Sequence, residues 1–246
     1  MRNPKWHRDE IILALDLYFR IEPGQVHARN PEIIELSEIL NQLPIHEDRP
    51  DEVKFRNPNG VGLKLSNMLA IDPNYQGKGM ASFSKLDKTI FDEFVNNREE
   101  LSSIAQAIRR TAKNEQLVKK IYHIEEEIDE GSFIVREGKV MYKLHRYIER
   151  KQSINKKKKA DYLKKNGKLD CEVCGFDFKK QYGDLGEGFI ECHHRIPLHQ
   201  LNGEKTTRLE DLALVCANCH RMLHKDLSIT VEELKTKITT IRMGEL

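Results

Sequence analysis

Apolar residues in the first half of the chain recur at the three- and four-residue intervals of amphipathic helices. Asn3 and Asn30 are each followed by a proline directly ahead of such a pattern, a pair suited to the N-cap and first helical position. Ser84 and Asp87 have the spacing of a capping box before a further apolar face, and another helix is predicted over 101–108. We interpret these apolar stripes as core, which makes the N-terminal part mostly helical.

Two turn-rich loops, Arg56–Gly60 and Asp72–Met80, flank a short predicted helix at Val61–Leu69. Two surface turns would account for their composition. Each loop also offers a basic residue and exposed backbone donors, which are the groups that approach a phosphate backbone closely. The loops are therefore either plain turns or contacts to nucleic acid.

The stretch from Arg109 to Asp170 is charged and weakly apolar. Alternating β-prone residues at Ser132–Lys143 predict a hairpin, and Leu144–Lys165 is typical of a basic helix. The C-terminal part combines β-prone segments with helices, so the predicted fold class is α+β. The predicted domains are a helical domain at 1–112, a charged linker with the hairpin and basic helix at 113–165, and a second domain at 166–246.

Composition narrows the class of protein. The 246 residues are 39% hydrophobic and 33% charged, which can support a buried core. No apolar run approaches about 18 residues and the N-terminus lacks the apolar stretch of a secretory signal, so we expect a cytoplasmic protein without a membrane partner. In a reducing compartment the five cysteines are expected to be metal ligands or free thiols.

The net charge is only +2, but basic residues crowd together before the first pair of cysteines. A block of this kind is as readily a solvated helix face as a surface for phosphates, and only an adjoining nuclease motif would favour phosphates. The block contains Arg146, Arg150, Lys151, Lys156, Lys157, Lys158, Lys159, Lys164 and Lys165.

Two Cys-x-x-Cys motifs predict a structural zinc site. Four thiolates from two such knuckles meet the tetrahedral preference of Zn²⁺ and leave no open position for a substrate. A redox dithiol or a chance match is disfavoured because two matched knuckles occur in one small region. Cys192 falls outside the pattern and is expected to be a buried or free thiol. The predicted zinc ligands are Cys171, Cys174, Cys216 and Cys219.

Four histidines are interleaved with the cysteines. His193 and His194 end a β-prone segment, while His220 and His224 follow the second knuckle at a spacing that places them on one face of a helix. Three imidazoles plus waters would hold a divalent ion with open positions for a phosphate oxygen. A plain zinc ribbon has no use for these histidines, so the pattern indicates a second metal site.

From about Tyr142 to His224 the order Cys-x-x-Cys, His-His, Cys-x-x-Cys-His-x-x-x-His resembles the HNH (ββα-metal) endonucleases, particularly the McrA-like restriction branch. The resemblance implies a zinc-stapled nuclease domain acting on double-stranded DNA with one catalytic Mg²⁺ or Mn²⁺, while Co²⁺ or Ni²⁺ would also fit imidazole ligands. It implies that His193, His220 and His224 bind this ion.

The same resemblance assigns His194 as the general base that deprotonates the attacking water. The asparagine that orients this base in the family corresponds to Asp211, which either orients His194 or lies nearer the metal. Arg195 and the basic helix are candidate phosphate contacts. Because one HNH site cuts one strand, a homodimer is expected. The apolar segment Leu227–Ile241 either packs on the nuclease or forms the dimer interface.

The N-terminal part resembles the DNA sulfur-binding domain attached to some McrA-like nucleases, on the residues Asn3–Tyr18, Arg56–Val61 and Asp72–Tyr75. This resemblance implies recognition of phosphorothioate DNA, in which sulfur replaces a non-bridging phosphate oxygen. Sulfur is larger and more weakly hydrated than oxygen, so a shallow apolar pocket framed by basic residues would prefer it. Pro58, Tyr75 and Lys78 are the candidates for this pocket, and Arg56 and Asn59 are expected to reach bases or phosphates. Asn57 is a further candidate DNA contact.

Three alternatives stay open. Other McrA-like nucleases read methylated or hydroxymethylated cytosine, which requires major-groove readout or an aromatic cage, and the single tryptophan, Trp6, is expected in the core. An HNH nicking or homing enzyme would read unmodified sequence. A non-catalytic zinc-dependent DNA-binding protein would need the four cysteines but not the four histidines.

Overall fold

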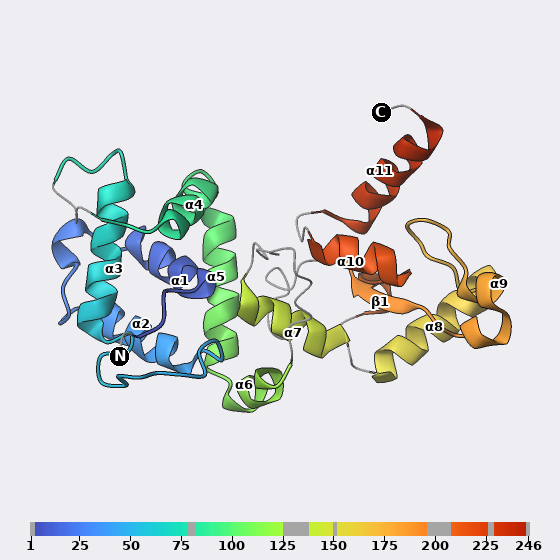
Figure 1. The fold of residues 1–246 in the computed structure, drawn as a ribbon, viewed down its shortest axis with the longest axis horizontal. Coiled ribbons are helices and arrows are strands. Elements are labelled where there is room, and N and C mark those ends of the chain that lie inside the picture. The colour runs from blue at the N-terminus through green and yellow to red at the C-terminus, as the bar shows by residue number, and fades with distance from the viewer. Residues whose placement is uncertain are drawn as a thin grey trace. The chain divides into compact units, whose positions relative to one another are not determined.

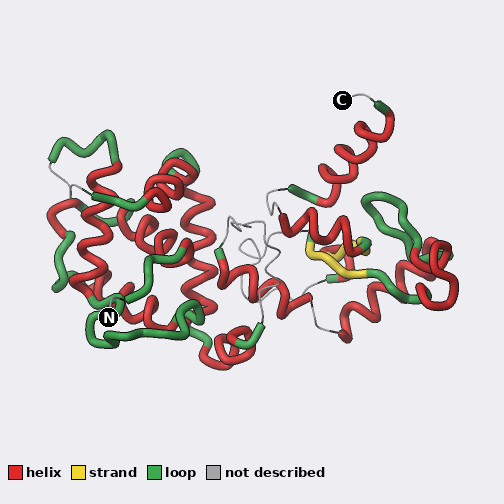
Figure 2. Tube along the Cα trace, viewed as in Figure 1, coloured by secondary structure: helices red, strands yellow, loops and turns green. Residues whose placement is uncertain are grey.

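The computed structural model describes residues 3–77, 82–124, 138–149, 152–195, 208–225 and 229–244. They form two compact units, which are considered separately. The N-terminal unit comprises the described residues up to Ile124 together with Gly138–Lys143, and the C-terminal unit comprises those from Leu144 onward (Figure 1). Helices dominate the regular structure of the described residues (Figure 2), and none of them is both long and apolar enough to cross a membrane.

The N-terminal unit is a bundle around its first helix, which packs against the next four α-helices. Ile11, Ile12, Leu13, Ala14 and Leu15 are completely buried, so the middle of this helix is apolar on all sides and forms the centre of the core. The elements are α1 (Arg8–Tyr18), η1 (Pro23–Gln25), α2 (Pro31–Gln42), α3 (Pro58–Ile71), α4 (Lys85–Phe94), α5 (Arg98–Ala112), α6 (Glu115–Tyr122) and the beginning of α7 (Lys139–Glu149).

Two of the three predicted helix starts are confirmed. The Asn30 side chain accepts a hydrogen bond from Glu32 N at the start of α2, and Ser84 forms a capping box with Asp87 at the start of α4. The predicted start at Asn3 is wrong, because α1 begins at Arg8. The Asn3 amide instead exchanges two hydrogen bonds with the backbone of Asp51, which fixes this segment as extended chain against a loop.

The predicted hairpin at 132–143 is wrong over residues 138–143, the part of it that the structure describes. Its first part lies outside the described residues, and the second part is the first turn and a half of α7. The two oxygens of the Asp9 carboxylate each accept a backbone hydrogen bond, from Lys139 N and Val140 N, at 2.8 Å. A carboxylate at a helix N-terminus satisfies orphan donors and complements the helix dipole. A residue distant in sequence therefore stabilises helix where the local pattern favours strand.

The segment predicted as a linker with one basic helix is divided between the units. The helix α6 belongs to the N-terminal unit, whereas α8 (Gln152–Asn166) belongs to the C-terminal unit. The predicted basic helix over 144–165 comprises the end of α7 and the whole of α8, which are separate helices.

A buried ion pair crosses the core of the N-terminal unit. Arg56 has a positive φ of 44° and donates from Nε and Nη2 to the Glu10 carboxylate at 2.6 and 2.8 Å. Its guanidinium also donates to the carbonyls of Pro4 and Lys5, and it lies 4.6 Å from the ring centroid of Trp6. These contacts hold the extended N-terminal segment and the loop at 51–57 against α1.

Glu10→Gln is expected to reduce the free energy of unfolding of the N-terminal unit by about 3–5 kcal/mol, because it leaves the buried Arg56 charge without a counter-charge. Fluorescence of Trp6, the single tryptophan, during urea denaturation measures this unit selectively. Glu35→Gln is the matched control, since Glu35 pairs with Lys113 at the exposed surface and should change stability by less than about 1 kcal/mol. Equal stability of the two variants would contradict the assignment.

The C-terminal unit is built on a two-stranded antiparallel sheet followed by a helix. The strands β1 (Glu191–His194) and β2 (Leu212–Val215) pair so that Glu191 is opposite Val215 and His194 is opposite Leu212. All of β2 is buried. The remaining elements are the end of α7, α8, α9 (Phe178–Tyr182), η2 (Gly183–Gly186), η4 (Leu209–Asp211), α10 (Ala217–Lys225) and α11 (Val231–Met243).

The apolar C-terminal segment packs within its own unit over part of its length. Val231 and Leu234 on α11 are buried in the core cluster that includes Val215 and Leu223, while Ile241 is 60% exposed. The helix therefore packs against the side of the C-terminal unit that contains the cysteine knuckles. This agrees with the first of the two arrangements predicted for Leu227–Ile241, packing within the chain. The expected homodimer stays a prediction.

Candidate active site

The four cysteines of the two knuckles converge. The Sγ atoms of Cys171, Cys174, Cys216 and Cys219 all lie within 4.8 Å of one another. In each knuckle the fourth residue donates its backbone N–H to the first sulfur at 3.5 Å, an arrangement that favours the thiolate. Hydrogen bonds from Cys216 and Cys219 lower the pKa of Cys171. The donor set fits a closed tetrahedral site.

A second group of metal-binding side chains gathers at the sheet. The donor atoms of His145, Glu149, His193 and His224 lie within 4.8 Å of one another. Glu149 is the shared partner: its Oε1 lies 2.7 Å from His145 Nε2 and 3.3 Å from His193 Nδ1, and its Oε2 lies 3.3 Å from His224 Nε2. The group is supplied by the end of α7, β1 and α10, all within the C-terminal unit. We call it the His145 cluster.

The protonation states in the His145 cluster suit a cation. Burial opposes the charge of Glu149, but the neighbouring His145 and hydrogen bonds from the histidines hold the pKa of Glu149 well below its usual range. Burial lowers the pKa of His193 to about 3 and also lowers that of His224, so both rings are neutral at pH 7. Glu149 Oε2 is buried and accepts no hydrogen bond from the described residues. Neutral imidazoles and a carboxylate fit a divalent metal ion.

His194 lies next to the His145 cluster and has a different environment. The side chain is 4% exposed, yet neither ring nitrogen has a hydrogen-bond partner among the described residues. Its ring centroid is 5.5 Å from that of His145. Burial first, and then the neighbouring His145, lower the pKa of His194 to about 4. Burial therefore keeps the ring neutral at pH 7, the form that a general base must have, while a pKa of about 4 makes it a weaker base than a free imidazole.

The segment that contains the cysteine knuckles and most of the site histidines matches a known protein family. Residues 171–226 match the family model described as HNH endonuclease. The chain carries an HNH endonuclease domain. It is therefore a metal-dependent DNA endonuclease. No curated protein and no solved structure matched the chain.

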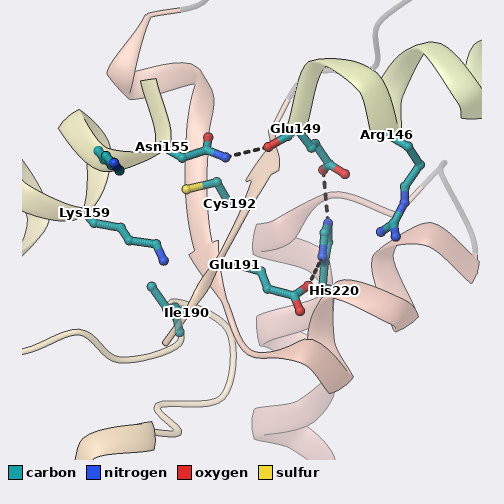
Figure 3. A pocket seen from close by; sticks show the side chains of 9 residues that line it. Arg146, Glu149, Asn155, Lys159, Ile190, Glu191, Cys192 and His220 are labelled. Carbon is teal, nitrogen blue, oxygen red and sulfur yellow. Dashed lines mark hydrogen bonds and ion pairs between the residues drawn. The ribbon is translucent and has the colours of Figure 1, made fainter. Parts of the chain in front are cut away.

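The HNH match includes His220, which lies beside the His145 cluster. His220 Nε2 is 3.0 Å from Glu149 Oε1 and 2.9 Å from His224 Nε2, and its Nδ1 pairs with Glu191 (Figure 3). Burial would lower its pKa, but Glu149 and Glu191 outweigh burial and raise the pKa of His220 to about 9. The predicted ligand is therefore held between two carboxylates at the edge of the cluster.

Asp211 has a local structural contact in the HNH domain. Its Oδ2 accepts a hydrogen bond from Arg208 N at 2.8 Å, which closes the turn η4, and its backbone oxygen accepts one from Arg195 N. The described residues show no hydrogen bond between Asp211 and His194, although the Asp211 charge favours the protonated form of His194. The guanidinium of Arg195, a candidate phosphate contact, is paired with Glu172 and Glu232.

Sequence reasoning missed two members of the His145 cluster. His145 and Glu149 precede residues 171–226, where the HNH match lies, and they occur in a segment read as a basic linker helix. Only their four-residue spacing, which places a histidine and a glutamate on one helix face, could have indicated them. Their approach to β1 and α10 is a tertiary feature.

The expected DNA contacts just before α3 and in its first turn differ in exposure. Arg56 is buried and bonded to Glu10, so the expectation that it reaches DNA is corrected: its guanidinium supports the N-terminal unit from within. The Asn57 side chain accepts from Gly60 N as the N-cap of α3. Pro58 is half-buried at the first helical position, and Asn59 is exposed.

Tyr75 lies at the opposite end of α3 from Pro58. The helix runs from Pro58 to Ile71, so at about 1.5 Å per residue its ends are roughly 20 Å apart. Figure 1 shows the loop after α3 at the far end of this helix. Tyr75 and Pro58 therefore do not line one shallow pocket. Lys78 lies outside the described residues.

Proposed function

We propose that the chain is a modification-dependent restriction endonuclease that hydrolyses phosphodiester bonds in phosphorothioate DNA. The proposal of hydrolysis rests on one observation. His194 is buried beside the His145 cluster, and neither of its ring nitrogens has a hydrogen-bond partner among the described residues. The choice of DNA is supported by the resemblance of the N-terminal residues to a sulfur-binding domain, which is a sequence argument.

In the proposed reaction His194 takes a proton from the water that attacks the phosphorus in line. A divalent ion, when bound by His145, Glu149, His193 and His224, supplies stabilisation of the charged phosphorane and of the leaving 3′ oxygen. Glu149 Oε1 forms hydrogen bonds with His145 and His220, and the carboxylate lies 3.3 Å from His193 and from His224, so it also fixes the shape of the site. Three imidazoles and one carboxylate suit Mn²⁺, Co²⁺ or Ni²⁺ better than Mg²⁺, which prefers oxygen ligands.

His220 and Glu191 complete the surroundings of this site. Glu191 faces His220 Nδ1, which directs His220 Nε2 toward Glu149 and His224. In this position His220 either orients the ligands or replaces one of them when the ion binds, as the HNH pattern implies. A carboxylate that fixes the orientation of a histidine is common around metal sites.

The four cysteines are proposed to bind one structural Zn²⁺. Cys171 and Cys216 belong to the core that also contains Leu214 and Leu223, so the ion would join the first knuckle to β2 and α10. Because β1 and α10 carry the catalytic histidines, the zinc ion would also keep these histidines in position.

The end of α3 that begins at Pro58 is the better candidate for contact with the modified phosphate. Its first turn contains no acidic residue, Asn59 is exposed, and backbone N–H groups at a helix start favour anions. The half-buried Trp6 lies near it, because Arg56, two residues before Pro58, is 4.6 Å from the Trp6 ring centroid. Tyr75 would contact DNA at a separate place. A homodimer would supply one HNH site for each strand.

Cleavage of matched plasmids tests the choice of DNA. Purified protein and Mn²⁺ are incubated with phosphorothioated, cytosine-methylated and unmodified plasmids. The proposal predicts cutting of the phosphorothioated plasmid alone, reduced by Asn59→Ala. Cutting of methylated DNA alone would overturn the assignment of the N-terminal unit while retaining the nuclease. Cutting of all three would show a nuclease that does not depend on modification.

A further inference from the structure

A pocket of about 390 Å³ lies beside the His145 cluster in the C-terminal unit. It is bounded by α7, α8, β1 and its approach, and α10 (Figure 3). Ile190 and Cys192 supply apolar lining. The polar lining consists of Arg146, Glu149, Asn155, Lys156, Lys159, Glu191 and His220.

The charges of this pocket favour an anion. Arg146, Lys156 and Lys159 contribute three cationic side chains, whereas the two carboxylates, Glu149 and Glu191, are both engaged with His220. Lys156 is exposed, and Lys159 is half-buried with its Nζ donating to Gly188 O at 3.0 Å. Figure 3 shows Lys159 extending toward the side of the pocket that Ile190 and Glu191 form.

The pocket is continuous with the metal-binding group. Glu149 belongs both to its lining and to the His145 cluster, and His220 contacts Glu149 and His224. An anion in the pocket would therefore lie close to a phosphate attacked at the cluster. The combination of apolar wall and cationic rim also matches a backbone unit of DNA, which presents an apolar sugar face next to a charged phosphate.

We propose that the pocket binds the phosphate adjacent to the scissile phosphate on the strand being cut. Lys156 and Lys159 contact its oxygens, and the neighbouring sugar packs against Ile190 and Cys192. The proposal rests on the proposed function in so far as cleavage occurs at the His145 cluster. It assigns a positioning role to one face of α8: the pocket fixes the register of the strand so that the scissile phosphate reaches His194.

A chemical double-mutant cycle tests this subsite. Wild type and Lys156→Gln/Lys159→Gln are compared on phosphorothioated duplexes in which one further backbone phosphate at a time, around the cut, is replaced by an uncharged methylphosphonate. The control is Lys235→Gln/Lys237→Gln, which removes the same charge from exposed positions of α11 that do not line the pocket. Cleavage rate is measured at subsaturating enzyme with Mn²⁺, and DNA affinity by fluorescence anisotropy at several salt concentrations.

Wild type and the control are expected to lose about tenfold in cleavage rate when the phosphate next to the cut is neutralised, a usual size for one strong ionic contact. On the phosphorothioated duplex without a methylphosphonate the pocket variant should be about tenfold slower than wild type, and it should lose nothing further when the phosphate next to the cut is neutralised. Its plot of log affinity against log salt should be shallower by about 1.

The subsite is overturned if the pocket variant is as sensitive as wild type to neutralisation at every position, or if the control reproduces its losses. Failure of the proposed function has a different signature. If wild type cuts no duplex, the anisotropy series still decides the pocket, because an unchanged salt slope in the pocket variant would reject it.

Discussion

His194→Ala is expected to slow DNA cleavage by about 10²–10⁴-fold, the usual contribution of a general base. The ring is buried and neutral, its pKa is lowered to about 4, and both nitrogens lack partners among the described residues. It lies outside the group of four side chains that could hold the ion. The substitution should therefore leave Mn²⁺ affinity within a few-fold of wild type, measured by isothermal titration calorimetry beside single-turnover cleavage.

The adjacent His193 provides the comparison. His193→Ala should weaken Mn²⁺ binding as well as cleavage, because His193 is a member of the His145 cluster. His123→Ala, at an exposed position after α6, should change neither quantity. If His194→Ala instead lost Mn²⁺ binding, or cut DNA at close to the wild-type rate, the assignment of base and ligand within this pair would be wrong.

Cys216→Ser is expected to lose the structural ion and the cooperative folding of the C-terminal unit. Structural Zn²⁺ contributes about 10–16 kcal/mol of apparent binding free energy, most of which is available only to the folded chain. Cys216 lies in the core cluster with Leu214 and Leu223, so the knuckle cannot open without exposing apolar surface. Zinc content per chain and circular dichroism measure the two effects, and cleavage should fall below detection.

Cys192→Ala is the control for this experiment. Cys192 is buried, but it is not one of the four clustered cysteines, and burial raises the pKa of its thiol to about 11. This variant should retain one zinc per chain. Trp6 fluorescence should show that the N-terminal unit stays folded in Cys216→Ser. Full zinc content and a folded C-terminal unit in Cys216→Ser would contradict the structural role.

The parts of the fold that sequence predicted well are those with local causes. Asn30 and Ser84 cap α2 and α4 through bonds that span two or three residues, so their signals are complete in the sequence. Asn3 and the expected hairpin were misjudged because distant partners decide their structure. Asp51 holds Asn3, and Asp9 stabilises the start of α7.

The candidate site also contains some residues whose roles have local sequence signals and others whose roles depend on distant partners. The cysteine knuckles and the histidines of α10 have fixed short spacings, so their chemistry was readable. Glu149 acquires its role only when α7 meets β1 and α10, which no local pattern records. Arg56 was misjudged for the converse reason: a basic residue in a turn-rich loop suggests exposure until Glu10 is found within 2.6 Å.

The location of bound Mn²⁺ tests the central claim most directly. Anomalous diffraction at the manganese edge, from crystals of the full chain grown with Mn²⁺, places the ion without recourse to activity. The account predicts an ion coordinated by His145, Glu149, His193 and His224. An ion bound by His193, His220 and His224 with no contribution from His145 or Glu149 would contradict it, and would make α7 a neighbour of the catalytic centre rather than part of it.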